Sequence, residues 1–228
     1  MDRTRSSAPS EQAELAGAAE PRGLLHVELD YPAEHAEELH DWYNGEHLPE
    51  RLRIAGFVSG RRFAALEGGP RWLAMYETER PAVLESPEYL HRLGPGETSW
   101  TKRILARNRN VRRTVCELIR GEVREERGPV PGGPPGLFSL RLSVALEGTD
   151  GEMIREEIGP RSLLGCQGVA QARLYRAVAD PSELFLLCEL SGVWAVQQPE
   201  FRRRWGRIAA ILDEASVGYH RGLYVRIL

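Results

Sequence analysis

The stretch DWYNGEHLPER, residues 41–51, holds the residues of this chain that are best suited to acid–base chemistry. The imidazole of His47, with an ordinary pKa of about 6.5, can accept or donate a proton near neutral pH. Tyr43 lies one helical turn earlier, where its hydroxyl could donate a hydrogen bond to a carbonyl or an enolate. The pair predicts proton transfer on a small oxygenated molecule. The alternative for His47 is a structural role, in which its ring caps the helix end before Pro49 by bonding a backbone carbonyl.

Strand-like alternation over residues 23–31 gives a second candidate, His26. The apolar residues of this segment share one face, while His26 and Glu28 share the other. Because the apolar face of such a strand normally meets helices, we expect His26 and Glu28 to point toward a cavity on the other side of the sheet. The alternative places both at the mouth of the cavity, in water or paired with Arg61 or Arg62.

Four further side chains could contact a ligand in such a cavity. Arg61 could bind a carboxylate or an enolate of the substrate, and a structural ion pair is the simpler role for it. Tyr76 alternates with Glu77 along its strand, so one of the two must face inward. Trp72 and Trp100 could form apolar walls around an aromatic ligand, with core filling as the alternative for both.

The histidines and cysteines form no metal-binding pattern, and we expect neither a metal nor a cofactor. His40 and His47 are two helical turns apart, and this separation of about 10 Å is too long for two ligands of one ion. The sequence contains no glycine-rich phosphate loop, nucleophile elbow or haem-attachment signature. Cys116, Cys166 and Cys188 have no close spacing, which fits a reducing cytoplasm.

The composition is typical of a soluble globular protein. Of the 228 residues, 42% are hydrophobic and 28% are charged, with a net charge of −3. This charge offers no basic field for nucleic acid or for a membrane surface, and the longest apolar runs are too short to span a bilayer. Residues 1–22 lack the apolar core of a secretory signal and are predicted to be a disordered leader.

An internal repeat organises the rest of the chain. The segment GFVSGRRFAALEGGPRWLAMYE (56–77) aligns without a gap on GVAQARLYRAVADPSELFLLCE (168–189). The offset is constant, because Arg173 follows Arg61 by 112 residues (173 − 61) and Glu189 follows Glu77 by 112 residues (189 − 77). An arginine in both copies favours a structural ion pair for Arg61, with Glu77 and Glu189 as the candidate partners.

Each copy predicts the order strand, helix, strand, strand, helix, strand. In the first copy the predicted strands are 23–31, 57–66, 71–78 and 111–119, with a helix over 33–53 and helical segments after Ser86 and over 98–107. In the second copy the predicted strands are 136–146, 169–178, 183–191 and 219–227, with helices near 151–164 and 199–215. The Pro- and Gly-rich residues 123–135 are predicted to link the domains 23–122 and 136–228.

This order predicts an α+β fold of two ferredoxin-like β-α-β-β-α-β repeats. Each repeat has one antiparallel sheet with helices on one face, so its other face needs a cover. We expect the two sheets to pack face to face as an intramolecular pseudo-dimer. If the faces do not fill completely, the space between them is a ligand cavity that His47 reaches.

The order of elements, together with WYNGEHLPERL, GFVSGRRF, WLAMYE, SPEY and SWTKRI, resembles the dimeric α+β barrel superfamily and, within it, the EthD-like proteins. The resemblance is strongest over residues 23–120, and the second copy has Ile158 or Gly159 where the first has His47. It implies chemistry such as that of cofactor-free cyclases, monooxygenases and lyase-like tailoring proteins, or of haem-binding enzymes. Barrels of this superfamily often assemble further, so a homodimer is one expectation.

We therefore expect a cofactor-free lyase- or cyclase-like enzyme in the cytoplasm, acting on a small, largely apolar, aromatic or polyketide-type molecule. His47 would move the proton, and Tyr43, with Arg61 as a further candidate, would stabilise the enolate charge. Three alternatives stay open, because this fold does not fix a function. They are a cofactor-free monooxygenase, a non-catalytic binding protein of a degradative or biosynthetic pathway, and a haem-binding protein.

Overall fold

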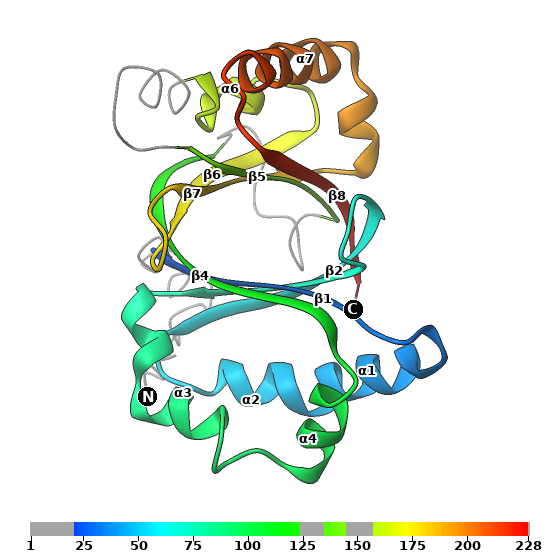
Figure 1. Cartoon of the computed structure of the whole chain (residues 1–228), viewed down its shortest axis with the longest axis vertical. Coiled ribbons are helices and arrows are strands. Elements are labelled where there is room, and N and C mark those ends of the chain that lie inside the picture. Colours follow the sequence, from blue (N-terminus) through cyan, green and yellow to red (C-terminus); the bar gives the residue numbers. More distant parts are fainter. Residues whose placement is uncertain (1–20, 124–134, 145–156, 228) are drawn as a thin grey trace, which may run out of the picture.

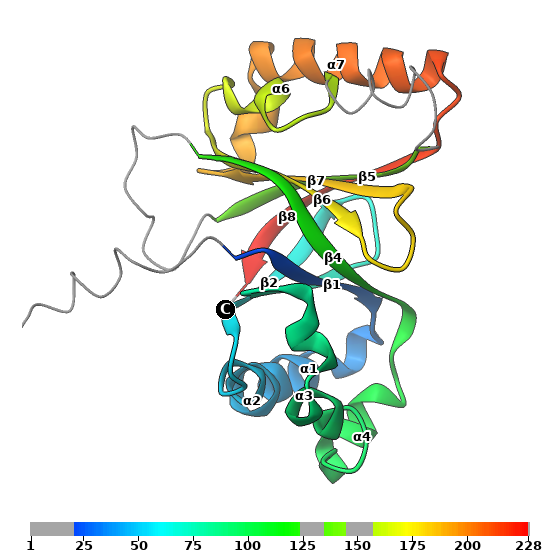
Figure 2. The same ribbon diagram turned by 90° about the vertical axis from the view of Figure 1, so that its left-hand side faces the viewer.

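A computed structural model describes residues 21–123, 135–144 and 157–227. In this part of the chain eight strands form a closed barrel, in the order β1-β3-β2-β8-β5-β7-β6-β4. Helices cover the barrel on two opposite sides (Figures 1 and 2). The predicted fold class, two ferredoxin-like repeats joined as a pseudo-dimeric α+β barrel, is therefore confirmed.

The N-terminal unit follows the predicted order of elements. Its strands are β1 (Gly23–Asp30), β2 (Phe57–Glu67), β3 (Trp72–Thr78) and β4 (Arg109–Val123). Its helices are α1 (Ala36–Trp42), α2 (Leu48–Leu52), α3 (Pro87–Arg92) and α4 (Ser99–Leu105). Short 3₁₀ turns, Ala33–His35 and Pro81–Glu85, precede α1 and α3.

The C-terminal unit repeats the order with a shorter described helical part. Its strands are β5 (Gly136–Ser143), β6 (Val169–Ala177), β7 (Glu183–Leu190) and β8 (Tyr219–Ile227). Its helices are α6 (Arg161–Leu164) and α7 (Pro199–Glu214), and a 3₁₀ turn, Val193–Gln197, precedes α7. Nearly all of the predicted leader and linker, and the first part of the predicted helix near 151–164, lie outside the described residues.

The two units are joined through their last strands, each of which pairs with one strand of its own unit and one strand of the other. β4 pairs with β1 of its own unit and with β6 of the other, and β8 pairs with β5 and with β2. All of these pairings are antiparallel. The two sheets therefore close into one hydrogen-bonded barrel, which leaves no free sheet edge.

Strand alternation divides the apolar side chains into three layers. One cluster lies between the N-terminal sheet and its helices, a second lies between the C-terminal sheet and its helices, and a third faces the interior of the barrel. On β1, for example, Leu24 belongs to the barrel cluster, whereas Leu25 belongs to the cluster under the N-terminal helices. The side chains of two successive strand residues are thus separated by the sheet itself.

The predicted helix over 33–53 is a single run of helical backbone with a change of pitch in the middle. α1 passes into a π-helical turn at Tyr43–His47, and this turn continues directly into α2. A π-helical turn holds one extra residue relative to the α-helix and is frequent at functional sites. No helix in the described ranges is long and apolar enough to cross a membrane.

Candidate functional site

The π-helical turn places His47 between the N-terminal helices and the sheet. The imidazole ring stacks on the indole of Trp42, with ring centroids 4.2 Å apart and an angle of 29° between the planes. It meets the ring of Tyr43 edge-on at 5.3 Å. The Nδ1 atom of His47 is buried and has no hydrogen-bond partner among the described residues. The helix continues through Pro49 to Leu52, so His47 does not cap a helix end.

Tyr76 of β3 comes close to His47 from the sheet. The two ring centroids are 6.1 Å apart, with the planes at 79°. The Tyr76 hydroxyl is also buried without a partner in the described part of the chain. Burial raises the pKa of Tyr43 to about 12 and that of Tyr76 well above its ordinary value. Both phenols therefore stay protonated at neutral pH and can donate hydrogen bonds.

The electrostatics of this layer keep His47 neutral. Burial lowers its pKa well below 6.5, and the positive charges of Arg51 and Arg62 lower it further. A neutral imidazole with a lowered pKa is a base that is ready to accept a proton at pH 7, although it is a weaker base than a free histidine. The geometry therefore supports proton abstraction by His47 with Tyr43 and Tyr76 as hydrogen-bond donors.

Arg62 belongs to this cluster, whereas the sequence analysis names its neighbour Arg61 as the candidate ligand-binding arginine. One terminal nitrogen of Arg62 lies 2.9 Å from Nδ1 of His40, and the other donates to Oδ1 of Asn44 at 3.5 Å. Its guanidinium carbon lies 4.0 Å from the centroid of the Tyr43 ring. The sequence does carry a signal for this difference, because strand alternation puts Arg62 and Arg61 on opposite faces of β2.

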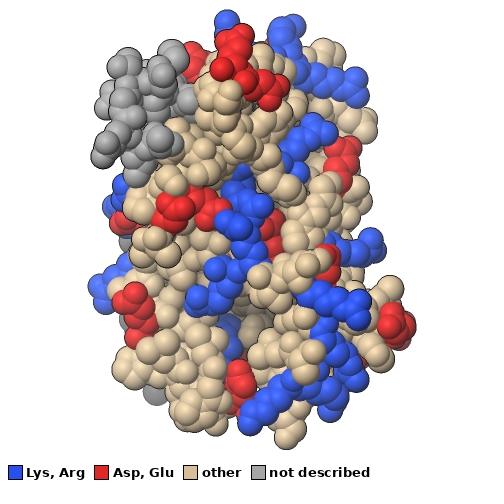
Figure 3. Space-filling model, viewed as in Figure 1, with Lys and Arg blue, Asp and Glu red and all other residues tan. Residues whose placement is uncertain are grey.

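Trp72 and Trp100 pack in the same apolar layer as His47. Trp72 meets the ring of His40 edge-on at 4.8 Å. Both indole nitrogens are buried and have no partner among the described residues. Figure 3 shows basic side chains gathered along the middle of one face of the molecule, and below them the surface is hollowed toward the level of the N-terminal helices.

The structure corrects the prediction that His26, Arg61 and His47 share one cavity between the two sheets. His26 and Arg61 face the interior of the barrel, where His26 lies 5.0 Å from the ring of Phe185 and Arg61 forms ion pairs. His47 lies on the other face of the sheet. The physical reason is that a helix covers only one face of its sheet, so a side chain on that helix cannot reach the opposite face.

The barrel interior contains a buried network of four charged residues that come from both copies of the repeat. Arg61 pairs with Glu77 at 3.2 Å and with Glu189 at 2.7 Å. Arg173 pairs with Glu77 and lies 4.0 Å from Glu189. Burial alone would raise the pKa of Glu77, but Arg61 and Arg173 bring it below its ordinary value. Arg61 therefore has the structural role that the repeat suggested.

A second polar group in the barrel surrounds Glu28. Its carboxylate accepts hydrogen bonds from Arg141 at 3.1 Å and from the Tyr224 hydroxyl at 3.3 Å. The arginine that pairs with Glu28 is thus Arg141 of the other repeat. Burial, with Arg141 and Arg112, lowers the pKa of His26 to about 3, and neither of its ring nitrogens has a hydrogen-bond partner in the described ranges.

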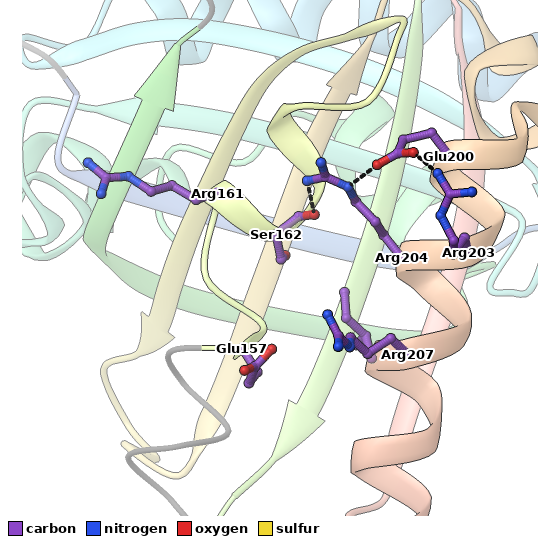
Figure 4. Close-up of a pocket in the computed structure, with 8 residues that line it drawn as sticks. Glu157, Arg161, Ser162, Glu200, Arg203, Arg204 and Arg207 are labelled. Atoms are coloured by element: carbon purple, nitrogen blue, oxygen red, sulfur yellow. Dashed lines mark hydrogen bonds and ion pairs between the residues drawn. The ribbon is translucent and has the colours of Figure 1, made fainter.

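An open pocket of about 850 Å³ lies on the C-terminal unit between α6 and α7 (Figure 4). Arg203 and Arg204 both bind the carboxylate of Glu200, and Arg204 also donates to the Ser162 carbonyl at 3.1 Å. The pocket is lined by Glu157, Arg161, Ser162, Glu200, Arg203, Arg204, Arg207 and Ile208. This pocket has one apolar wall residue and no acid–base pair, so it fits the predicted chemistry poorly.

Metal binding gains no support either, because no cluster of three or more His, Cys, Asp or Glu side chains able to hold an ion occurs in the described ranges.

No protein-family model matches the sequence, and no curated protein is similar enough to count as a relative. Solved structures do match over most of their length. An anthrone oxidase-like protein superposes with a TM-score of 0.63 and 11% identity, covering 92% of each chain. A provisionally assigned monooxygenase from Lactobacillus acidophilus NCFM gives 0.56 and 10% identity, covering 90% of this chain and 94% of its own.

A variant of chlorite dismutase from Candidatus Nitrospira defluvii gives a TM-score of 0.57 and 9% identity, covering 94% of this chain and 95% of its own. Identities at this level establish the fold alone. These structures do not single out the EthD-like family within the superfamily. The chain therefore has the ferredoxin-like dimeric α+β barrel fold, with both halves of the barrel supplied by one polypeptide.

Proposed function

We propose that this protein is an enzyme without a bound cofactor, which removes a proton from a small, largely apolar, oxygenated molecule. The reaction takes place between the helices and the sheet of the N-terminal unit. His47 is the base, and the hydroxyls of Tyr43 and Tyr76 donate hydrogen bonds to the oxyanion that forms. The proposal moves the predicted site from the space between the sheets to the layer under the helices.

One observation carries the proposal. Nδ1 of His47 and the hydroxyl of Tyr76 are buried in the same layer without hydrogen-bond partners among the described residues, on rings 6.1 Å apart. Buried polar atoms in native proteins are bonded in the great majority of cases. A base and a donor left open next to each other are the two groups that deprotonation next to a carbonyl requires.

The walls of the layer support an aromatic or polyketide-type substrate. Trp42, Trp72 and Trp100 belong to the same apolar cluster or pack against it. Indole rings bind planar apolar molecules and exclude water, which strengthens the hydrogen bonds to a developing oxyanion. Cyclisation, elimination and decarboxylation could each proceed from the enolate.

Oxygenation is the second candidate for the fate of the enolate. The similar structures include one named as anthrone oxidase-like and one provisionally assigned as a monooxygenase. An anthrone is an enolisable aromatic ketone, and its carbanion reacts with dioxygen to give an anthraquinone and water. The same His47 and tyrosines would serve this chemistry, because dioxygen reacts only after the proton has been removed.

Deuterium exchange tests the proton transfer independently of the later fate of the enolate. Dithranol, an anthrone, is incubated with the protein in deuterated buffer without oxygen, and loss of its methylene hydrogens is monitored by NMR. We expect catalysed exchange that falls on the order of a hundredfold in His47→Ala. His26→Ala, which removes a buried histidine on the other face of the sheet, should retain the exchange.

Other outcomes point elsewhere. Exchange at the wild-type rate in folded His47→Ala protein would contradict the proposed role of His47. Binding of dithranol to the wild type without exchange would favour a non-catalytic binding protein. A Soret band in the purified protein would favour the haem-binding alternative. Oxygen uptake with formation of the anthraquinone, measured in air, would select oxygenation as the fate of the enolate.

A further inference from the structure

Arg62 is a buried cation that has no ion-pair partner among the described residues. Its side chain is 3% exposed, and it lies in the layer that holds His47. The groups that it contacts are neutral or polar: His40, Asn44 and the ring of Tyr43. Burial lowers the pKa of Arg62. Ionised Tyr43 and Tyr76 would oppose this shift, but both phenols stay protonated at neutral pH.

The adjacent residue, Arg61, is a buried arginine whose positive charge is neutralised by carboxylates. Arg61 points to the other face of β2 and forms ion pairs with two carboxylates, Glu77 and Glu189. Arg62 forms no ion pair within the described residues. Two successive arginines on one strand are thus in opposite electrostatic situations.

Two carboxylates of the helical run that holds His47, Glu46 and Glu50, have other partners. Glu46 accepts hydrogen bonds from Trp42 of α1, from Thr98, which caps α4, and from Thr101 of α4. Glu50 pairs with Arg92 at 2.7 Å and with Arg51 at 3.5 Å. Neither of them forms an ion pair with Arg62, and none is formed by Asp41, which follows His40 in α1.

A buried guanidinium that lacks an anion costs free energy unless a ligand supplies one. The group has five N–H donors in a planar fork, and the contacts with His40 and Asn44 use two of them. The remaining donors suit the two oxygens of a carboxylate. Burial and Arg62 lower the pKa of His40, so its neutral imidazole accepts a hydrogen bond from Arg62 and brings no negative charge to it.

We propose that the molecule bound in this layer carries a permanent negative group, with a carboxylate as the simplest case, and that Arg62 pairs with it. The inference names the substrate class and rests on the proposed function for the location of the site. An aromatic or polyketide-type acid would thus be held at its anionic end by Arg62, while His47 acts on an acidic C–H bond elsewhere in the molecule. Both residues contact the ring of Tyr43: the guanidinium carbon of Arg62 lies 4.0 Å and the ring centroid of His47 lies 5.3 Å from its centroid.

A matched pair of probes tests the inference by binding alone. 1-Hydroxy-2-naphthoate and its neutral amide have the same rings and the same shape, and calorimetry gives the dissociation constant of each. We expect the wild type to prefer the carboxylate by at least about tenfold, as a charge-assisted hydrogen bond implies. Arg62→Gln should lose this preference and bind the amide as before. Arg53→Gln, which removes an exposed arginine at the C-terminal end of α2, should keep this preference.

Thermal unfolding of the unliganded protein adds a readout that a merely structural arginine would not give. Arg62→Met removes the buried charge and keeps much of the apolar volume, so the melting temperature should stay the same or rise. A structural arginine would lower it. Equal affinity of the wild type for both probes, no binding of the naphthoate, or an equal loss for both probes in Arg62→Gln would overturn the proposal.

A failure of the anion site at Arg62 can be distinguished from a failure of the proton transfer by His47. The same pair of probes is measured with His47→Ala. If the preference for the carboxylate is retained while deuterium exchange in the wild type is absent, the anion site stands and the proton transfer fails. If exchange is catalysed but the preference is absent, His47 is the base of a neutral substrate and the anion site fails.

Discussion

Arg61 and Glu189 belong to different halves of the chain, and Nη2 of the arginine lies 2.7 Å from Oε1 of the glutamate inside the barrel. Their counterparts in the internal repeat, Arg173 and Glu77, also form an ion pair with each other. Two copies of one sequence unit thus meet through the residues that they share. The network ties the two halves together, because each arginine lies within 4.0 Å of a carboxylate of its own half and of a carboxylate of the other half.

Breaking this network should destabilise the whole barrel. Glu77→Gln and Glu189→Gln each leave an arginine in the interior without one of its carboxylates, and we expect each to lower the free energy of unfolding by about 3 kcal/mol. In the double variant the two losses should not add, because the residues share both arginines. Urea unfolding of the four proteins measures the coupling. Glu117→Gln, which removes an ion pair that is 44% exposed on both sides, is the control and should cost less than about 1 kcal/mol.

The element order and the repeat could be predicted because they depend on local periodicity. The sequence predicts a helix start at Ser86, and its side chain does accept the hydrogen bond of the Tyr89 amide at 3.2 Å. The constant offset between Arg61 and Arg173 indicates a shared structural role, and the ion pairs agree with it. These features need no knowledge of how distant segments meet.

The closure of the barrel and the place of the site could not be obtained in the same way. The pairing of β4 and β8 with the other unit joins residues such as Cys116 and Ala177, which lie far apart in the sequence. The alternation of β2 is visible in the sequence, but whether Arg61 or Arg62 shares the site depends on which face of the sheet the ligand meets. The π-helical turn at Tyr43–His47 leaves no clear mark on the sequence.

The two buried tyrosine hydroxyls on opposite sides of the sheet should behave differently when they are removed. Tyr76→Phe deletes a hydroxyl that has no partner among the described residues, so stability should be unchanged or slightly higher, while catalysed exchange should fall by about tenfold or more. Tyr224→Phe deletes a hydroxyl that donates to Glu28 and should cost about 1 kcal/mol of stability with little effect on exchange. Thermal unfolding and the dithranol assay, run on both variants, check the contrast. A loss of stability in Tyr76→Phe equal to that in Tyr224→Phe would place Tyr76 in a structural role.

Acid should destabilise the protein through its buried histidines. The pKa of His26 falls from 6.5 in the unfolded chain to about 3 in the fold, so below pH 6.5 the unfolded state takes up a proton that the folded state does not. Stability is therefore present above pH 6.5 and is lost as the pH falls, by about 2 kcal/mol between pH 7 and pH 5 from His26 alone. Chemical unfolding of wild type and His26→Gln at both pH values measures the difference. His91→Gln, which replaces an exposed histidine, should retain the full dependence.

The rate of catalysed deuterium exchange should depend on the protonation of His47. The pKa of His47 lies well below 6.5, so the neutral base is already formed at pH 6.5 and the rate should be flat from there to pH 8. Below that range the rate should fall as His47 takes up its proton. The pH profile of deuterium exchange, corrected for the buffer reaction, checks this. A rise of the rate through pH 7 to 8 would point to a different base.

Two glycines near the site test how closely the helix and the sheet must approach. Gly45 lies within the π-helical turn, and a Cβ at this position would meet nothing within 4 Å. Gly45→Ala should therefore raise the stability by about 0.5 to 1 kcal/mol, because alanine loses less backbone entropy on folding, and it should leave exchange intact. At Gly60 a Cβ would come within 2.7 Å of Leu48 and 3.3 Å of the Tyr76 ring. Gly60→Ala must push β2 away from α2 or displace Tyr76, so both stability and exchange should fall. The same response of exchange to both substitutions would mean that Tyr76 does not depend on this close approach.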